Sequence, residues 1–252
     1  MSLTAKLILS PLLVAQAIGA RARLPRLPEP TGERAGVVGC GPVLQLLIAG
    51  DSSAAGVGVG NQRDALAQRL AATLADAAKA RVSWQLHARS GLTTAQTLAL
   101  LQELAPHRSD VAVVVTGVND VVDQVPSRRA VGAREALTNW LRNGHGVQHV
   151  VFAPLPPIHQ FPGLPQPLRW VAGADARRHN AVLKEWAGSR GDVSCVDMDV
   201  PLNRGVMASD GFHPGEPVYR YCATTIAQHI ATHVWPLLHL NLHQDLHLDA
   251  SP

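Results

Sequence analysis

The sequence is poor in aromatic residues and in cysteine, and it has no apolar run long enough to span a membrane. Phe, Trp and Tyr make up 4% of its 252 residues, so no surface that stacks nucleic-acid bases is expected. A net charge of +3 with scattered basic residues also argues against nucleic acid as a partner. Three cysteines, Cys40, Cys195 and Cys222, are too few and too widely spaced for a disulfide framework or a zinc signature, which favours a reducing compartment.

The N-terminal apolar run, residues 7–20, is shorter than the roughly 20 residues that a spanning helix needs. Three interpretations stay open. In the first, residues 1–17 are a signal peptide and the protein is exported, since Ala15-Gln16-Ala17 has the small-x-small form of a cleavage site. Alternatively, residues 7–20 make peripheral contact with a membrane, or they dock on the domain. The positive charge is stronger after the run than before it, which disfavours export and favours a cytoplasmic protein.

The chain length allows one substantial core. We predict a single domain over residues 37–236, preceded by the apolar helix and a Pro-, Arg- and Gly-rich linker in residues 1–36, and followed by a tail, residues 237–252. His239, His243 and His247 of this tail would share one face of a helix. A terminal tail offers no rigid, closed set of ligands, so we expect no metal there.

From residue 43 onward, short apolar runs alternate with longer helical patterns. The predicted strands are 43–49, 81–87, 110–115, 147–153 and 192–196. The predicted helices are 64–79 with Asp64 as N-cap, a helix capped by Thr93 or Thr94 that runs to about residue 104, and 127–142, 168–188 and 217–235. Such alternation predicts an α/β fold with a five-stranded parallel sheet covered by helices on both faces. Ligands of such folds bind beyond the carboxyl ends of the strands.

The exit of the first predicted strand reads Gly50-Asp51-Ser52-Ser53. A serine directly behind a buried strand and a glycine is held on a tight turn with its hydroxyl exposed. It becomes a nucleophile only if a neighbouring base removes its proton. The alternative is a polar turn or helix cap, which Ser and Asp also serve well.

A candidate base lies in Asp210-Gly211-Phe212-His213-Pro214, just before the last predicted helix. A carboxylate three residues before a histidine can accept a hydrogen bond from one ring nitrogen while the other faces a nucleophile. None of the other eleven histidines combines such an acid with flanking Gly and Pro. A surface loop histidine is the alternative interpretation.

Two further strand exits carry candidate donors for an oxyanion. Asn119 follows the strand 110–115, where its side-chain amide can point into the same cleft as Ser52. Gly91 follows the strand 81–87 and allows close approach of its backbone amide. Turns and helix caps use the same residue types.

Together, Gly50-Asp51-Ser52, Ser90-Gly91-x-Thr-Thr, Gly117-x-Asn119-Asp120 and Asp210-x-x-His213-Pro214 resemble the four blocks of the SGNH (GDSL-like) hydrolase superfamily, in order and spacing. The resemblance implies Ser52 as nucleophile, His213 as general base and Asp210 as orienting acid. It implies an oxyanion hole made of the Ser52 and Gly91 amides and the Asn119 side chain. It also implies a flavodoxin-like three-layer α/β/α fold with strand order 2-1-3-4-5, and neither a metal nor an organic cofactor.

The resemblance therefore predicts a serine esterase that forms an acyl-enzyme on small-molecule esters of short to medium acyl chains. Alternatives are a carbohydrate O-acetylesterase, a thioesterase or lysophospholipase, and a catalytically silent binding module of the same fold. The proline-rich loop 154–167 follows the fourth strand, and Phe152, Phe161 and Phe212, with Trp170 nearby, are candidates for an apolar wall around the acyl group. A rigid connector packed on the core is the alternative for this loop.

Overall fold

The computed structural model describes residues 3–200 and 202–238, and the side chains from residue 9 onward within these ranges. The strands are β1 (Ala35–Val38), β2 (Val43–Gly50), β3 (Arg81–Ala88), β4 (Val111–Val115), β5 (His149–Phe152) and β6 (Val193–Cys195). The helices are α1 (Leu3–Arg23), α2 (Ser52–Ala55), α3 (Leu66–Ala78), α4 (Thr94–Leu104), α5 (Val118–Val122), α6 (Ser127–His145), α7 (Leu168–Gly188) and α8 (Glu216–His229), with short turns η1 (Gln62–Asp64) and η2 (Ile158–Gln160) and a π-helical extension η3 (Ile230–Val234).

The strands form one sheet in the order β1-β3-β2-β4-β5-β6. The five strands from β3 to β6 are parallel and have the predicted 2-1-3-4-5 order, so the flavodoxin-like α/β prediction is confirmed. The sixth strand, β1, was not predicted. It pairs antiparallel with β3 at the edge, and its alternately exposed and half-buried side chains lack the apolar pattern of a buried strand.

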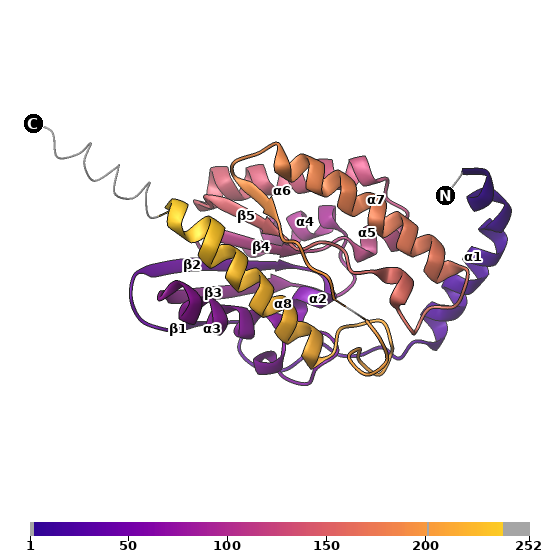
Figure 1. Cartoon of the computed structure of the whole chain (residues 1–252), viewed down its shortest axis with the longest axis horizontal. Coiled ribbons are helices and arrows are strands. Elements are labelled where there is room, and N and C mark those ends of the chain that lie inside the picture. The colour runs from indigo at the N-terminus through magenta and orange to yellow at the C-terminus, as the bar shows by residue number, and fades with distance from the viewer. Residues whose placement is uncertain (1–2, 201, 239–252) are drawn as a thin grey trace, which may run out of the picture.

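Helices cover both faces of the sheet and bury two apolar cores (Figure 1). On one face, α3 and α8 form a core with side chains of β3, β2 and β4, around Leu70, Ile226 and Ile48. On the other, α4, α6 and α7 pack around Leu141 and Phe152. This three-layer arrangement leaves the loops at the carboxyl ends of the strands as the place where polar side chains can gather.

Several predicted element ends shift by one to three residues in the structure, and the starts of two helices show why. Asp64 does not cap α3: it lies in η1, which Asn61 caps, and it pairs with Arg69 at 3.1 Å. The last helix begins one residue earlier than predicted, at Glu216, and continues from α8 into the π-helical η3.

The segment between α1 and β1 packs on the domain although it has little regular structure. Pro30 is buried, and Glu29 accepts hydrogen bonds from the amide and the hydroxyl of Ser90, both at 2.8 Å. The predicted linker thus touches the body of the fold, and its last two predicted residues already belong to β1.

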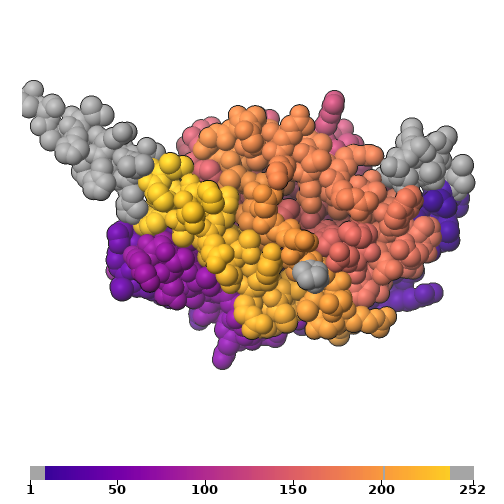
Figure 2. Space-filling view, in the orientation of Figure 1, coloured from indigo at the N-terminus to yellow at the C-terminus, as the bar shows by residue number. Residues whose placement is uncertain are grey.

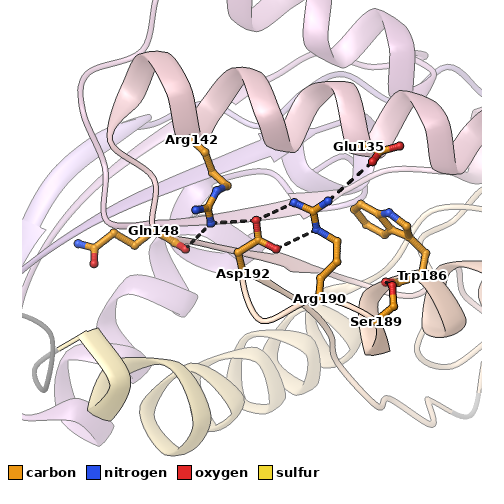
Figure 3. Close-up of polar contacts among 7 residues, drawn as sticks. All are labelled: Glu135, Arg142, Gln148, Trp186, Ser189, Arg190 and Asp192. Atoms are coloured by element: carbon orange, nitrogen blue, oxygen red, sulfur yellow. Dashed lines mark hydrogen bonds and ion pairs between the residues drawn. The ribbon is translucent and has the colours of Figure 1, made fainter.

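A polar cluster joins α6 to the turn between α7 and β6 (Figure 3). The Asp192 carboxylate accepts from Arg142 at 2.9 Å and from two nitrogens of Arg190 at 2.8 and 2.7 Å. Hydrogen bonding from Arg190 keeps the pKa of Asp192 below its ordinary value. Arg190 also lies over the Trp186 ring, 5.5 Å from its centroid. These partly exposed pairs link α6 to the residues just before β6, and each contributes little free energy.

Among the described residues, no helix combines the length and apolar character needed to cross a membrane.

Candidate active site

Ser52 stands at the carboxyl end of the central strand β2, where the chain turns into α2. Gly50 ends the strand against β4, and a Cβ at this position would lie 1.9 Å from the Val115 carbonyl oxygen, so only glycine fits. Asp51 then caps α2 by accepting a hydrogen bond from the Ser53 amide at 2.9 Å. This local chemistry holds Ser52 as the first residue of a one-turn helix.

The imidazole of His213 faces Ser52 across 161 residues of sequence. The Nε2 atom of His213 is 3.1 Å from the Ser52 hydroxyl oxygen, and the Nδ1 atom is 2.6 Å from the Asp210 carboxylate. The second Asp210 oxygen accepts from the backbone amides of Phe212 and His213 at 2.9 and 3.0 Å. These contacts orient the ring so that a hydrogen on Nδ1 points at Asp210 and Nε2 is left for Ser52.

Asp210 is 5% exposed, and its hydrogen bonds keep it ionised. Burial raises its pKa, but bonds from the His213 ring and from the His213 and Phe212 amides outweigh burial, so the pKa stays below its ordinary value. A buried anion beside Nδ1 stabilises an imidazolium at His213. The pair can therefore take a proton from Ser52.

Asp51 is the second buried carboxyl group near Ser52. Burial raises its pKa to about 7, with a smaller opposing effect from its bond to the Ser53 amide. Asp51 is 2% exposed and directly precedes Ser52 in the chain, whereas the carboxylate at His213 Nδ1 is that of Asp210. It shapes the turn and does not replace Asp210 as the partner of the histidine.

Asn119 comes from the first turn of α5 and lines the same pocket as Ser52 and His213. One hydrogen of its side-chain amide goes to the Leu92 carbonyl oxygen at 3.0 Å. Leu92 follows Gly91, which has the left-handed φ of +86° that glycine adopts readily. The bond therefore joins the two loops that carry Asn119 and Gly91.

Asp120 and Thr94 reinforce this junction, although no contact between them was predicted; of Thr93 and Thr94, the two candidate caps of α4, the structure uses Thr93. The buried Asp120 carboxylate accepts from the Thr94 amide at 3.2 Å and from its hydroxyl at 2.5 Å. Arg134, fully buried behind the loop, donates to the Thr116 carbonyl oxygen at 3.4 Å. In the sequence, the only signal for this contact was that Asp120 directly follows Asn119. Its partner, Thr94, is 26 residues away in the chain and is brought to Asp120 by the fold.

An apolar pocket opens beside the Ser52 and His213 side chains. It encloses about 910 Å³ including its open mouth. One wall comes from the loop after β5, another from Met198, Val200, Leu202 and Met207, and a third from α8. Its apolar lining includes Val118, Leu155, Phe161, Met198, Val200, Leu202, Met207, Phe212, Val218, Cys222 and Ile226. Most of this lining was not predicted from the sequence, because α8 and the side chains of Met198 and Met207 approach the serine only in the tertiary structure.

The predicted aromatic wall is partly wrong. Phe161 and Phe212 do line the pocket and pack edge to face, with ring centroids 5.2 Å apart. Phe152 does not: it is the last residue of β5, and its side chain points into the opposite core and packs on Trp186, with ring centroids 5.8 Å apart. Trp170 lies on the surface of α7, 47% exposed, outside the pocket lining.

In residues 3–200 and 202–238, no group of three His, Cys, Asp or Glu side chains is placed to hold a metal ion. His239, His243 and His247 lie outside the described residues. Burial raises the pKa of Cys195 to about 11 and that of Cys222 to about 12, so both thiols are protonated and poorly nucleophilic at neutral pH.

Comparison with known proteins relates this arrangement to a family. The sequence model of the GDSL-like Lipase/Acylhydrolase family matches residues 48–221, which contain all four sequence blocks. No curated protein matches the sequence significantly.

Solved structures share the fold at low sequence identity. A lipase from a goat rumen metagenome is 22% identical, with a TM-score of 0.59 over 75% of this chain and 98% of that one. An esterase, EstA, from Pseudoalteromonas sp. is 18% identical, with a TM-score of 0.52 over 72% and 96%. A family 3 carbohydrate esterase from Clostridium thermocellum is 17% identical, with a TM-score of 0.57 over 78% and 98%.

Proposed function

The chain belongs to the GDSL-like lipase/acylhydrolase family of ester hydrolases, and we propose that it cleaves carboxylic esters of short to medium acyl chains through an acyl-enzyme intermediate. One observation carries the proposal: the hydrogen-bonded series Ser52, His213 and Asp210 opens on an apolar pocket. The hydroxyl supplies a nucleophile, the buried pair supplies a base, and the pocket supplies space for an acyl chain.

In the first half of the reaction, the Ser52 hydroxyl oxygen attacks the ester carbonyl carbon. His213 Nε2, 3.1 Å away, takes the hydroxyl proton, and the Asp210 carboxylate at Nδ1 stabilises the resulting imidazolium. The carbonyl oxygen becomes an oxyanion. His213 then delivers its proton to the alcohol oxygen as the carbon–oxygen bond breaks, which releases the alcohol.

Three donors are assigned to the oxyanion: the amides of Ser52 and Gly91 and the free hydrogen of the Asn119 side chain. The bond from Asn119 to Leu92 orients that side chain in advance. Fixed donors stabilise developing charge without reorganising during the reaction, and each is worth on the order of 3 kcal/mol.

In the second half, water replaces the alcohol and attacks the acyl carbon of the Ser52 ester. His213 takes a proton from the water and returns one to Ser52 as the acid leaves. Every proton transfer uses the same Nε2 atom, so no metal or organic cofactor enters the scheme.

The pocket lining favours an apolar acyl group over a sugar as the group held next to Ser52. Phe161, Phe212 and Met207 line the pocket with side chains that cannot form hydrogen bonds to sugar hydroxyl groups. An alkyl chain gains about 25 cal/mol for each Å² of apolar surface that it buries there.

The test is a series of p-nitrophenyl esters from acetate to palmitate, with an acetylated sugar alongside, on the wild type and on Ser52→Ala and His213→Ala. We expect a maximum at short or medium chains and losses of roughly four to six orders of magnitude in kcat for both variants. A fluorophosphonate probe should label the wild type and Ser127→Ala, but not Ser52→Ala. Activity on the sugar alone would replace the substrate proposal, and near-normal activity of either variant would end the mechanism.

A further inference from the structure

The helix α1 touches the rest of the domain along one narrow face. Leu13 and Gln16 lie on this face and are half-buried. The Gln16 side chain donates to the Gln166 carbonyl oxygen at 2.7 Å and accepts from the Leu168 amide at 3.0 Å. A groove of about 940 Å³, including its open mouth, remains between the helix and the loop Pro162–Pro165. The helix is thus hydrogen-bonded in place but not packed into the core.

The opposite face of α1 is apolar and exposed. It carries Pro11, Val14, Ile18 and Ala22, at the spacing i, i+3, i+7 and i+11 that makes one stripe on a helix. Val14 is 57% exposed and Ile18 is 66% exposed. The outward face of a helix in a water-soluble domain normally carries polar residues, so this stripe indicates a surface that something apolar covers.

The charge around the stripe has one sign. Asp and Glu are absent from the chain before Glu29. Arg21, Arg23 and Arg26, at the end of α1 and just after it, are all exposed. In the described part of the chain, none of the three forms an ion pair with a carboxylate. An apolar face flanked only by basic side chains matches an anionic lipid surface.

The helix lies at one end of the molecule (Figures 1 and 2), next to the loop that follows β5. Pro162–Pro165, which faces α1 across the groove, follows Phe161 of the ester pocket. The Gly163 amide donates to the Gly211 carbonyl oxygen at 2.9 Å, within the loop that carries Asp210 and His213. A surface that binds α1 would therefore lie close to the loops that line the pocket.

We propose that α1 lies flat in the surface of an anionic membrane. The Val14 and Ile18 side chains enter the apolar layer, while Arg21, Arg23 and Arg26 pair with lipid phosphates. The hydrolase is then held where apolar esters are concentrated. Binding does not require catalysis, so this proposal and the hydrolytic one fail independently.

The test is sedimentation of the full chain with phosphatidylcholine vesicles, with and without phosphatidylglycerol. We expect binding to the anionic vesicles, lost on raising the salt to about 1 M, where the Debye length shrinks to about 3 Å. Val14→Glu/Ile18→Glu should reduce vesicle partitioning by roughly tenfold or more, because two buried apolar side chains become charged. Arg21→Gln/Arg23→Gln/Arg26→Gln should remove the preference for phosphatidylglycerol.

The matched control is Val37→Glu/Leu104→Glu, which charges two exposed apolar side chains away from α1 and should bind as the wild type does. Hydrolysis of a soluble p-nitrophenyl ester is measured on every sample and should be the same for all. Failure of the wild type to bind, equal binding to both vesicle types, or unchanged binding of Val14→Glu/Ile18→Glu would overturn the proposal. The proposal would also be overturned if the protein were a dimer in solution that Val14→Glu/Ile18→Glu converts to a monomer, since a second copy of the chain would then cover the apolar stripe.

Discussion

Glu29 accepts two hydrogen bonds from Ser90, one from the amide and one from the hydroxyl, each 2.8 Å long. Burial raises the pKa of Glu29, but these bonds and the nearby Arg34 outweigh burial and keep the pKa below its ordinary value. Ser90 directly precedes Gly91. An ionised carboxylate from the segment before β1 therefore holds the loop whose amide we assign to the oxyanion hole.

Glu29→Gln should lower kcat about tenfold with little change in KM. The neutral amide accepts more weakly than a carboxylate, so the Gly91 loop loses order where charge develops in the transition state. Steady-state kinetics on a soluble ester measure the two constants separately. Glu33→Gln, on the exposed neighbouring glutamate, is the matched control and should leave both unchanged. A rise in KM alone would mean that Glu29 affects substrate binding instead.

Asp210→Asn should lower kcat/KM by about three to four orders of magnitude. The amide cannot stabilise the imidazolium at His213, and its NH₂ group competes for the position of Nδ1–H. Far-ultraviolet circular dichroism should remain that of the wild type, and Asp76→Asn on the exposed side of α3 should stay fully active. An Asp210→Asn variant with a tenth of normal activity or more would remove this residue from the mechanism.

Cys222→Trp should shift the acyl-chain optimum toward acetate. Cys222 lines the pocket from α8, and its protonated thiol has no part in the chemistry. A larger side chain removes space for the chain, and each excluded methylene changes discrimination by about 1–3 kcal/mol. The ratio of octanoate to acetate hydrolysis measures the effect. Cys222→Ala enlarges the same site and should move the ratio the other way; equal ratios in both variants would place the acyl chain elsewhere.

Acid should destabilise the protein through His149, which lies at the start of β5. Its Nε2 is 2.9 Å from the Ser194 hydroxyl, which also contacts His229 at 2.8 Å. Burial, with a smaller effect of His229, lowers the pKa of His149 to about 4, and burial also lowers the pKa of His229. Between pH 6.5 and 4 the unfolded chain binds protons that the folded chain does not, so stability falls as the pH falls.

For His149 alone, the loss across this pH window is roughly 3 kcal/mol. His149→Gln keeps a polar partner for Ser194 and removes the titration, so its free energy of unfolding should depend less on pH. Urea titrations at several pH values between 4 and 7 measure this slope. His159→Gln, at an exposed histidine, should retain the wild-type slope. Equal slopes for all three proteins would show that His149 does not control acid stability.

The sequence by itself determined the class of fold and the local chemistry of the site. Apolar runs such as residues 110–115 predict buried parallel strands, because only side chains that face two covering layers can be apolar throughout. Gly50, Ser52 and the pair Asp210 and His213 also carry their own local signals, since a turn, a helix start and a three-residue offset are short-range features. The edge strand β1 escaped prediction because an edge strand needs no buried pattern.

Only the tertiary structure decided which residues meet. The contact between Ser52 and His213, the tie between Asp120 and Thr94, and the pocket wall from α8 all join segments far apart in the chain. Successive side chains of a strand point to opposite faces of the sheet, and Phe152 points into the core on the face away from the pocket. A shift of one residue would have reversed this direction. Contacts between distant segments depend on the order of strands in the sheet and on packing between helices, so they cannot be predicted from a local sequence pattern.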